Sequence, residues 1–219
     1  MKWLWIVGAS YAAALVLREL GATPGTAPSP GPTPSPGPVP DPTPKPGPHI
    51  PNAPFPQIAT GKTRVIGDSL GVGLAPPLRA LLGSVDGSAI GGTRIDTWVA
   101  WGVHKNIGGN APLVLVSLGT NDIASNVKAD AIHRDVPHLV HQIRNGGSKV
   151  AWIGPPSLPW PGADLRAALA AELATMGVPL FDSTALTFER SADRIHATPA
   201  GYKTWAAAIA VWLRSKGLV

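Results

Sequence analysis

Apolar and polar positions change their spacing along the second part of the chain. From Thr63 onward, short apolar runs alternate with longer segments in which apolar residues recur at helical spacing. The short runs predict five β-strands, at Thr63–Gly67, Ser88–Ile90, Leu113–Leu118, Val150–Ile153 and Pro179–Phe181. The longer segments predict five helices, at Leu70–Leu82, Thr93–Lys105, Ala129–Arg144, Ala163–Met176 and Pro199–Lys216. Pro137 lies inside the third of these helices and is expected to kink or split it.

Strands and helices alternate throughout this region, which is typical of a parallel sheet covered by helices on both faces. The sequence therefore predicts an α/β fold, a three-layer α/β/α sandwich with a central five-stranded parallel sheet. Open sheets of this kind bind ligands where the carboxyl ends of the strands meet the loops. Polar residues that directly follow a predicted strand are therefore the candidate site residues.

The N-terminal end of the chain differs from the rest. Trp3–Leu17 is an apolar run of fifteen residues that follows Met1 and Lys2. As a helix it would span roughly 22 Å, which is less than the hydrocarbon core of a bilayer, about 30 Å. This length favours a signal peptide, whereas the lack of a clear small-residue cleavage site favours an uncleaved anchor. We interpret residues 1–22 as one of these two segments.

A proline-rich segment follows at residues 23–58. It contains 15 of the 25 prolines, many of them at alternate positions. Because proline fixes φ and lacks an N–H donor, this segment is expected to be an extended linker, on the order of 100 Å long. Residues 59–219 are then one folded domain. An anchor with this linker places the domain outside the membrane, in the periplasm or at the cell surface, and a cleaved signal peptide makes it a secreted protein.

Charge and cysteine content narrow the classes of function. The formal net charge is +5, but the 18 Lys and Arg residues are dispersed among 13 Asp and Glu residues. Nucleic-acid binding normally uses clustered basic residues, so we do not expect a nucleic-acid partner. The chain has no cysteine, which excludes disulfides, a thiolate nucleophile and cysteine-ligated metals.

Four short segments carry candidate chemistry, and three of them follow a predicted strand. They are Gly67-Asp68-Ser69-Leu70, Gly91-Gly92-Thr93, Gly119-Thr120-Asn121-Asp122 and Asp193-Arg194-Ile195-His196. Ser69 would stand at a helix N-terminus, where developing negative charge is stabilised. Asp193 and His196 are three residues apart, so the carboxylate can orient the imidazole as a base for a serine nucleophile.

The other two segments supply candidate oxyanion donors. The side-chain amide of Asn121 can donate to an oxyanion without carrying charge. A glycine N–H can face a substrate without a side chain in the way, and here either Gly91, which we prefer, or Gly92 fits this role. The N–H of Ser69 completes the set. Asp122 is expected to hold its own loop by hydrogen bonds.

Residues 67–71 also match the G-x-S-x-G pattern of the α/β-hydrolase nucleophile elbow. In that fold several strands precede the serine, and the acid and histidine lie on separate loops. Here Ser69 follows the first strand of the domain, and Asp193 and His196 are close in sequence. The α/β-hydrolase interpretation is therefore the second choice.

Taken together, the four segments resemble those of the SGNH, or GDSL, hydrolase superfamily, and the resemblance extends over the whole domain. In that family four blocks contribute serine, glycine, asparagine and histidine, and Ser69, Gly91, Asn121 and His196 match them in order, while Asp193 matches the acid. The resemblance implies a flavodoxin-like sandwich and an ester or thioester hydrolase that needs no metal or other cofactor.

The expected activity is that of a serine esterase acting through an acyl-enzyme, with O-acetyl groups of cell-wall or other polysaccharides as one substrate class. The alternatives are a lipase or thioesterase acting on lipid or short-chain acyl esters, and a non-catalytic carbohydrate-binding module of the same fold. Trp160 lies in a proline-rich loop after the fourth strand, where substrate binding and packing are equally good explanations. His133, His138 and His141 share a predicted helix, and we interpret them as a polar face rather than a metal site.

Overall fold

The computed structural model describes residues 63–102 and 111–219. This part of the chain forms a five-stranded sheet with the strand order β2-β1-β3-β4-β5, in which every pairing is parallel. The strands are β1 (Thr63–Gly67), β2 (Val85–Gly87), β3 (Leu113–Ser117), β4 (Lys149–Ile153) and β5 (Leu180–Phe181). The strand order reverses its direction between β1 and β3, the place where open α/β sheets bind their ligands.

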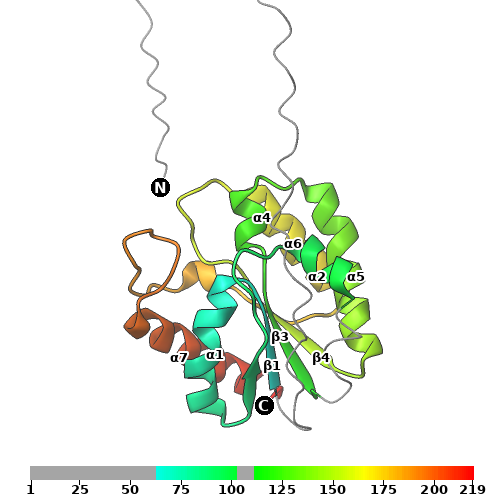
Figure 1. Cartoon of the computed structure of the whole chain (residues 1–219). Helices are drawn as coiled ribbons and strands as arrows, with labels where there is room; N and C mark the ends of the chain where they lie inside the picture. Colours follow the sequence, from blue (N-terminus) through cyan, green and yellow to red (C-terminus); the bar gives the residue numbers. More distant parts are fainter. Residues whose placement is uncertain (1–62, 103–110) are drawn as a thin grey trace, which may run out of the picture. The chain divides into compact units, whose positions relative to one another are not determined.

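Helices cover both faces of the sheet (Figure 1). One face carries α1 (Ser69–Leu82) and α7 (Pro199–Ser215), which pack against each other. The other face carries α2 (Ile95–Trp101), α5 (Ala129–Asn145) and α6 (Ala163–Thr175). The short helix α4 (Thr120–Ala124) and the 3-10 turn η1 (Ser183–Ala185) follow β3 and β5. The predicted three-layer α/β/α sandwich is confirmed.

The side chains of β3 alternate between two hydrophobic layers. Val114 and Val116 pack on the side of α5 and α6, whereas Leu113 and Leu115 pack on the side of α1 and α7. β1 and β4 alternate in the same way. A strand buried on both faces needs mostly apolar residues, which explains the apolar runs of β3 and β4 in the sequence. β1 departs from this, because Arg64 is buried at 1% exposed beside Val65 and Ile66.

The second strand was predicted at the wrong place. The structure has β2 at Val85–Gly87 rather than Ser88–Ile90. Asp86 is not a typical strand residue, but Val85 is buried and pairs with Thr63, which fixes the strand there. The following residues still run along β1, because the N–H of Ile90 donates to the Gly67 carbonyl at 2.8 Å.

Two helices also differ from prediction. α2 starts later than expected, at Ile95, and ends at Trp101, where Gly102 caps it in a left-handed conformation. α5 continues through Pro137 as a single helix of 17 residues, so the predicted split does not occur. A proline removes only one helical hydrogen bond, and the apolar face of α5, which includes Val136 and Leu139, remains packed in the core.

Within residues 63–102 and 111–219, no helix has the length and apolar character needed to cross a membrane. The predicted signal peptide or anchor (1–22) and linker (23–58) lie outside the described residues.

Candidate active site

Ser69 is the first residue of α1, directly after the turn that ends β1. Asp68 caps the helix, because its carboxylate accepts a hydrogen bond from the N–H of Leu70 at 2.9 Å. Gly67 makes the turn possible, since it has a φ of +153° and a Cβ at this position would lie 2.1 Å from the carbonyl oxygen of Ser117 in β3. Only glycine allows so close an approach of two strands. Backbone packing therefore places Ser69 at a helix N-terminus.

His196 reaches Ser69 from the loop that precedes α7. Its Nε2 lies 2.8 Å from the Ser69 Oγ, and its Nδ1 lies 2.6 Å from the Asp193 Oδ2. When Nδ1 carries the proton shared with Asp193, Nε2 is free of a proton and can accept the one from Ser69. The structure thus brings together the three residues that the sequence singled out as nucleophile, base and acid.

The Asp193 carboxylate is held by its own loop. Its other oxygen, Oδ1, accepts from the backbone N–H groups of Ile195 at 2.9 Å and His196 at 3.0 Å. The hydrogen bond with the His196 ring, followed by these two backbone bonds, lowers the pKa of Asp193 to about 2. The carboxylate is therefore ionised at neutral pH. Its side chain is 42% exposed, and water also favours the charged form.

Asn121 lies in the first turn of α4, where the sequence had predicted a loop. Its Nδ2 donates to the backbone carbonyl of Thr93 at 3.0 Å. The Thr93 hydroxyl lies 3.0 Å from the Gly67 carbonyl oxygen and accepts from the Trp98 Nε1 at 2.9 Å. Thr93 therefore connects the ends of β1, α2 and β3, and its carbonyl fixes the orientation of the Asn121 amide.

The two glycines before Thr93 differ in their relation to the serine. A Cβ built on Gly91 would lie 3.7 Å from the Ser69 Cβ, whereas one built on Gly92 would meet nothing within 4 Å. Gly92 has a φ of +79°, a left-handed conformation that suits glycine. Gly91 is thus the glycine beside Ser69, and Gly92 forms the turn.

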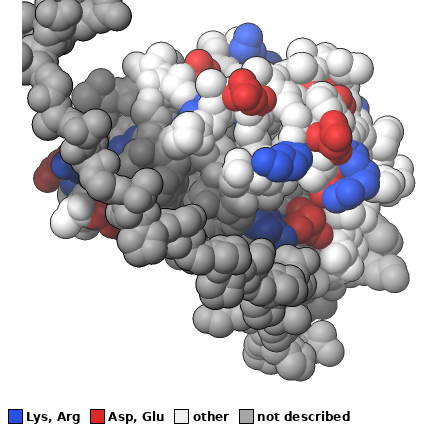
Figure 2. Space-filling view, turned by 90° about the horizontal axis from the view of Figure 1, so that it is seen from above, with Lys and Arg blue, Asp and Glu red and all other residues white. Residues whose placement is uncertain are grey.

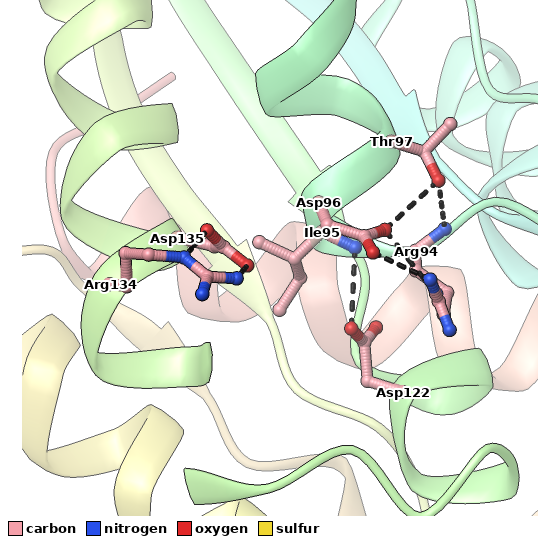
Figure 3. A network of polar contacts seen from close by, with 7 residues as sticks. All are labelled: Arg94, Ile95, Asp96, Thr97, Asp122, Arg134 and Asp135. Carbon is pink, nitrogen blue, oxygen red and sulfur yellow. Dashed lines mark hydrogen bonds and ion pairs between the residues drawn. The ribbon is translucent and has the colours of Figure 1, made fainter. Parts of the chain in front are cut away.

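Two carboxyl groups are buried behind the site. Asp122 accepts from the N–H of Ile95 at 3.4 Å (Figure 3), so it connects α4 to α2 instead of holding only its own loop. Burial raises the pKa of Asp122 to about 6. Burial, together with the nearby charge of Asp122, raises the pKa of Asp68 to about 7.

Sequence analysis missed the structural roles of Asp68 and Thr93. An Asp just before a helix is a common N-cap, so that signal was available for Asp68. The role of Thr93 depends on partners 26 and 28 residues away and leaves no local pattern.

The remaining candidate residues lie elsewhere on the surface. His133 of α5 pairs with Glu172 of α6, with 2.6 Å between Nδ1 and Oε1. Among the described residues, no group of three or more His, Cys, Asp or Glu side chains is placed to hold a metal ion. Trp160, in the segment between β4 and α6, is 38% exposed. Lys and Arg lie among Asp and Glu on the face shown in Figure 2.

Two cavities lie close to elements of the site. One has a volume of about 410 Å³, and its lining includes Ile123, which is two residues after Asn121. The lining also includes Asn126, Lys128, Pro161 and Asp164. The other, of about 460 Å³, lies between α1 and α7, and its lining includes Gly73, Pro76, Pro77, Pro199 and Tyr202. Apolar residues predominate in both linings. The first also includes the polar side chains of Asn126, Lys128 and Asp164, and the second those of Tyr202 and Lys203.

The chain is similar to known proteins in both sequence and structure. The model of the GDSL-like Lipase/Acylhydrolase family matches residues 65–204. No curated protein matches the chain.

Several solved structures share the fold. A lipase/acylhydrolase from Enterococcus faecalis has a TM-score of 0.58 at 20% identity, covering 71% of this chain and 96% of its own. An aryl esterase from M. smegmatis has a TM-score of 0.56 at 20% identity, with coverages of 71% and 99%. A carbohydrate acetylesterase from Sinorhizobium meliloti has a TM-score of 0.58 at 17% identity, again with coverages of 71% and 99%.

Proposed function

Since the chain belongs to the GDSL-like lipase/acylhydrolase family, whose members hydrolyse ester bonds, we propose that it is a serine esterase that removes O-acetyl groups from polysaccharides, cell-wall polymers included. The observation that carries the catalytic part is the hydrogen-bond chain from the Ser69 Oγ to the His196 Nε2, at 2.8 Å, and on to Asp193. The catalytic roles of Ser69, His196 and Asp193 are part of this proposal.

In the first half of the reaction, the Ser69 Oγ attacks the carbonyl carbon of the ester. The proton of the hydroxyl passes to the His196 Nε2, and Asp193 stabilises the resulting imidazolium. When the tetrahedral intermediate collapses, the bond to the alcohol breaks and His196 gives its proton to the leaving oxygen. The acyl group is then bound to Ser69 as an ester.

In the second half, a water molecule attacks the acyl carbon while His196 accepts its proton. The bond to the Ser69 Oγ breaks, and His196 returns the proton to that oxygen. Carboxylic acid leaves, and the resting state is restored. All of these proton transfers use groups of this chain, of the substrate and of the attacking water.

The negative oxygen of both tetrahedral intermediates needs donors. We assign this role to the N–H groups of Ser69 and Gly91 and to the Asn121 side chain. The N–H of Ser69 belongs to the first turn of α1, where backbone donors have no acceptor within the helix. An amide has two N–H groups, so Asn121 can keep its bond to Thr93 and offer the second one to the substrate.

Polysaccharide as the substrate is supported by the cavity whose lining includes Ile123, two residues after Asn121. Its volume of about 410 Å³ falls in the range of small-molecule sites, and Asn126, Lys128 and Asp164 offer hydrogen bonds to hydroxyl groups. The exposed ring of Trp160 directly precedes Pro161 of this lining and provides a surface on which a sugar ring can stack. Export on a proline-rich linker, also part of the proposal, would bring the enzyme to such polymers.

The apolar cavity between α1 and α7 favours the second candidate, a lipase or thioesterase. Gly73 of its lining lies one helical turn after Ser69, so an acyl chain of the substrate could occupy it.

Acetate release from acetylated xylan, compared with hydrolysis of p-nitrophenyl acetate, butyrate and octanoate and of an acyl-CoA, tests the proposal. We expect kcat/KM to fall as the acyl chain lengthens, and Ser69→Ala to abolish both hydrolysis and labelling by a fluorophosphonate. Ser215→Ala, an exposed serine at the end of α7, is the matched control. Preference for octanoate would favour the lipase, and wild-type protein without hydrolysis or labelling would favour a binding module.

A further inference from the structure

The loop that carries Asp193 and His196 is closed at its base by backbone hydrogen bonds. Arg190 and Ala197 form an isolated antiparallel bridge. The N–H of Ser191 donates to the His196 carbonyl at 2.8 Å. These bonds hold the two ends of the loop together. At its exposed tip, the N–H of Arg194 donates to the Ser191 carbonyl at 2.9 Å.

The tip has a backbone conformation that needs support. Arg194 has a φ of +59°, in the left-handed region that non-glycine residues seldom adopt. This residue lies between Asp193 and His196, so a change in its φ and ψ would turn the carboxylate away from the imidazole.

The side chain of Arg190 adds to that support from outside the tip. Its Nη1 lies 2.9 Å from the carbonyl oxygen of Ile195 and 3.4 Å from that of Arg194. These two carbonyls belong to the residues that separate Asp193 from His196. A charged donor makes stronger bonds to carbonyls than a neutral one does. The guanidinium therefore holds the segment that sets the distance between the two side chains.

Arg190 is itself fixed to the core. Its guanidinium carbon lies 4.4 Å above the ring of Phe188. Phe188 stacks on Trp205 of α7, with 4.8 Å between ring centroids, and Trp205 is only 1% exposed. Burial lowers the pKa of Arg190, while the nearby charges of Tyr202 and Asp193 raise it. The cation thus connects a buried aromatic stack to the exposed end of the loop.

We infer that Arg190 is a positioning residue for the reaction, which keeps the His196 Nε2 at hydrogen-bond distance from the Ser69 Oγ by holding the carbonyls of Arg194 and Ile195. The inference rests on the proposed function of Ser69, His196 and Asp193. A displacement of about 1 Å in such a pair lowers the rate by roughly 100-fold, so holding the loop has a direct effect on turnover.

The test compares Arg190→Ala, Arg190→Lys and Arg190→Gln with the wild type, with p-nitrophenyl acetate as substrate. We expect Arg190→Ala to lower kcat by about 10- to 100-fold and to leave KM within about 2-fold. The rate of Ser69 labelling by a fluorophosphonate should fall by a similar factor. Arg190→Lys and Arg190→Gln each keep one donor group, so their kcat values should lie between those of Arg190→Ala and the wild type. Added guanidinium ion at millimolar concentration should restore part of the kcat of Arg190→Ala.

Arg144→Ala is the matched control. Arg144 also donates from Nη2 to a backbone carbonyl, that of Met176, at 2.9 Å. It lies in the last turn of α5, at the end that leads into β4, away from the carboxyl ends of the strands. We expect its loss to leave kcat unchanged.

A wild-type kcat for folded Arg190→Ala would overturn the inference. A loss of kcat that guanidinium leaves unchanged would do the same, because it would give Arg190 a purely structural role. If Arg190→Ala does not fold, wild-type kcat in both Arg190→Lys and Arg190→Gln would overturn it. A wild-type protein without hydrolysis or labelling would instead contradict the proposed function, so the two failures are distinguishable.

Discussion

Asn121 has one hydrogen-bond partner within the protein and, in the proposed reaction, a second one in the substrate. Its bond to the Thr93 carbonyl orients the amide, and the proposed second donation stabilises the oxyanion. We expect Asn121→Ala to lower kcat for p-nitrophenyl acetate by about 100-fold or more, the usual cost of an oxyanion donor, roughly 3 kcal/mol. Steady-state kinetics measure this, and Asn145→Ala at the end of α5 is the control. A kcat within a few-fold of wild type would exclude Asn121 as a donor.

Among single residues, the sequence predicted those whose side chains have a characteristic reactivity. A serine, a histidine and an aspartate in the right segments predicted a contact that the structure has at 2.8 and 2.6 Å. Arg190 was not identified, because its partners are backbone carbonyls, and any residue can provide a carbonyl. Its role depends on the path of the loop rather than on the residues in it.

Among contacts between neighbouring elements, the contact of β1 with β3 at Gly67 leaves no room for a side chain. A Cβ there would lie 2.1 Å from the Ser117 carbonyl oxygen, and neither strand can move without breaking the sheet. We expect Gly67→Ala to reduce the free energy of unfolding by about 3 kcal/mol or more, measured by urea denaturation. It should also lower activity, because Ser69 follows this contact.

Gly83 provides the matched control for this change. It also has a positive φ, +75°, but a Cβ there would meet nothing within 4 Å. Gly83→Ala should therefore cost only about 1 kcal/mol, the strain of a left-handed alanine. Equal losses of stability in the two variants would show that backbone conformation, not strand contact, sets the requirement at Gly67.

The elements themselves were predictable to different degrees. β3 and β4 were found because strands buried on both faces are mostly apolar. β1 was found from Val65 and Ile66, although it also buries Arg64. β2 was misplaced because Val85 is its only fully buried residue, and its partner, β1, decides which three residues pair. The helix α4 was missed because five residues are too few to show helical spacing.

At the scale of the whole molecule, the buried carboxyl groups behind the site couple folding to pH. Asp68 follows β1 and Asp122 follows β3, and both are at most 2% exposed. Both have raised pKa values because burial disfavours their charged forms. The neighbouring strands therefore bring two carboxyl groups into the protein interior, where burial favours the protonated, uncharged form of each.

The sign of the coupling follows from proton binding. For Asp122, the unfolded chain releases its proton near pH 4 and the folded protein near pH 6. Between these values the folded protein binds more protons, so its free energy of unfolding falls as the pH rises, and it levels off above the folded pKa. The lowered pKa of Asp193 acts in the opposite direction, but only below about pH 4.

Asp122→Asn removes one of these titrations and keeps an oxygen that can accept from Ile95. We expect the decrease in unfolding free energy between pH 4 and pH 7 to be smaller in this variant by on the order of 2 kcal/mol. Urea denaturation at several pH values measures it, with Asp164→Asn in the first turn of α6 as the exposed control. A pH dependence parallel to that of the wild type would show that the pKa of Asp122 is the same in the folded and unfolded protein, and that burial does not control its protonation.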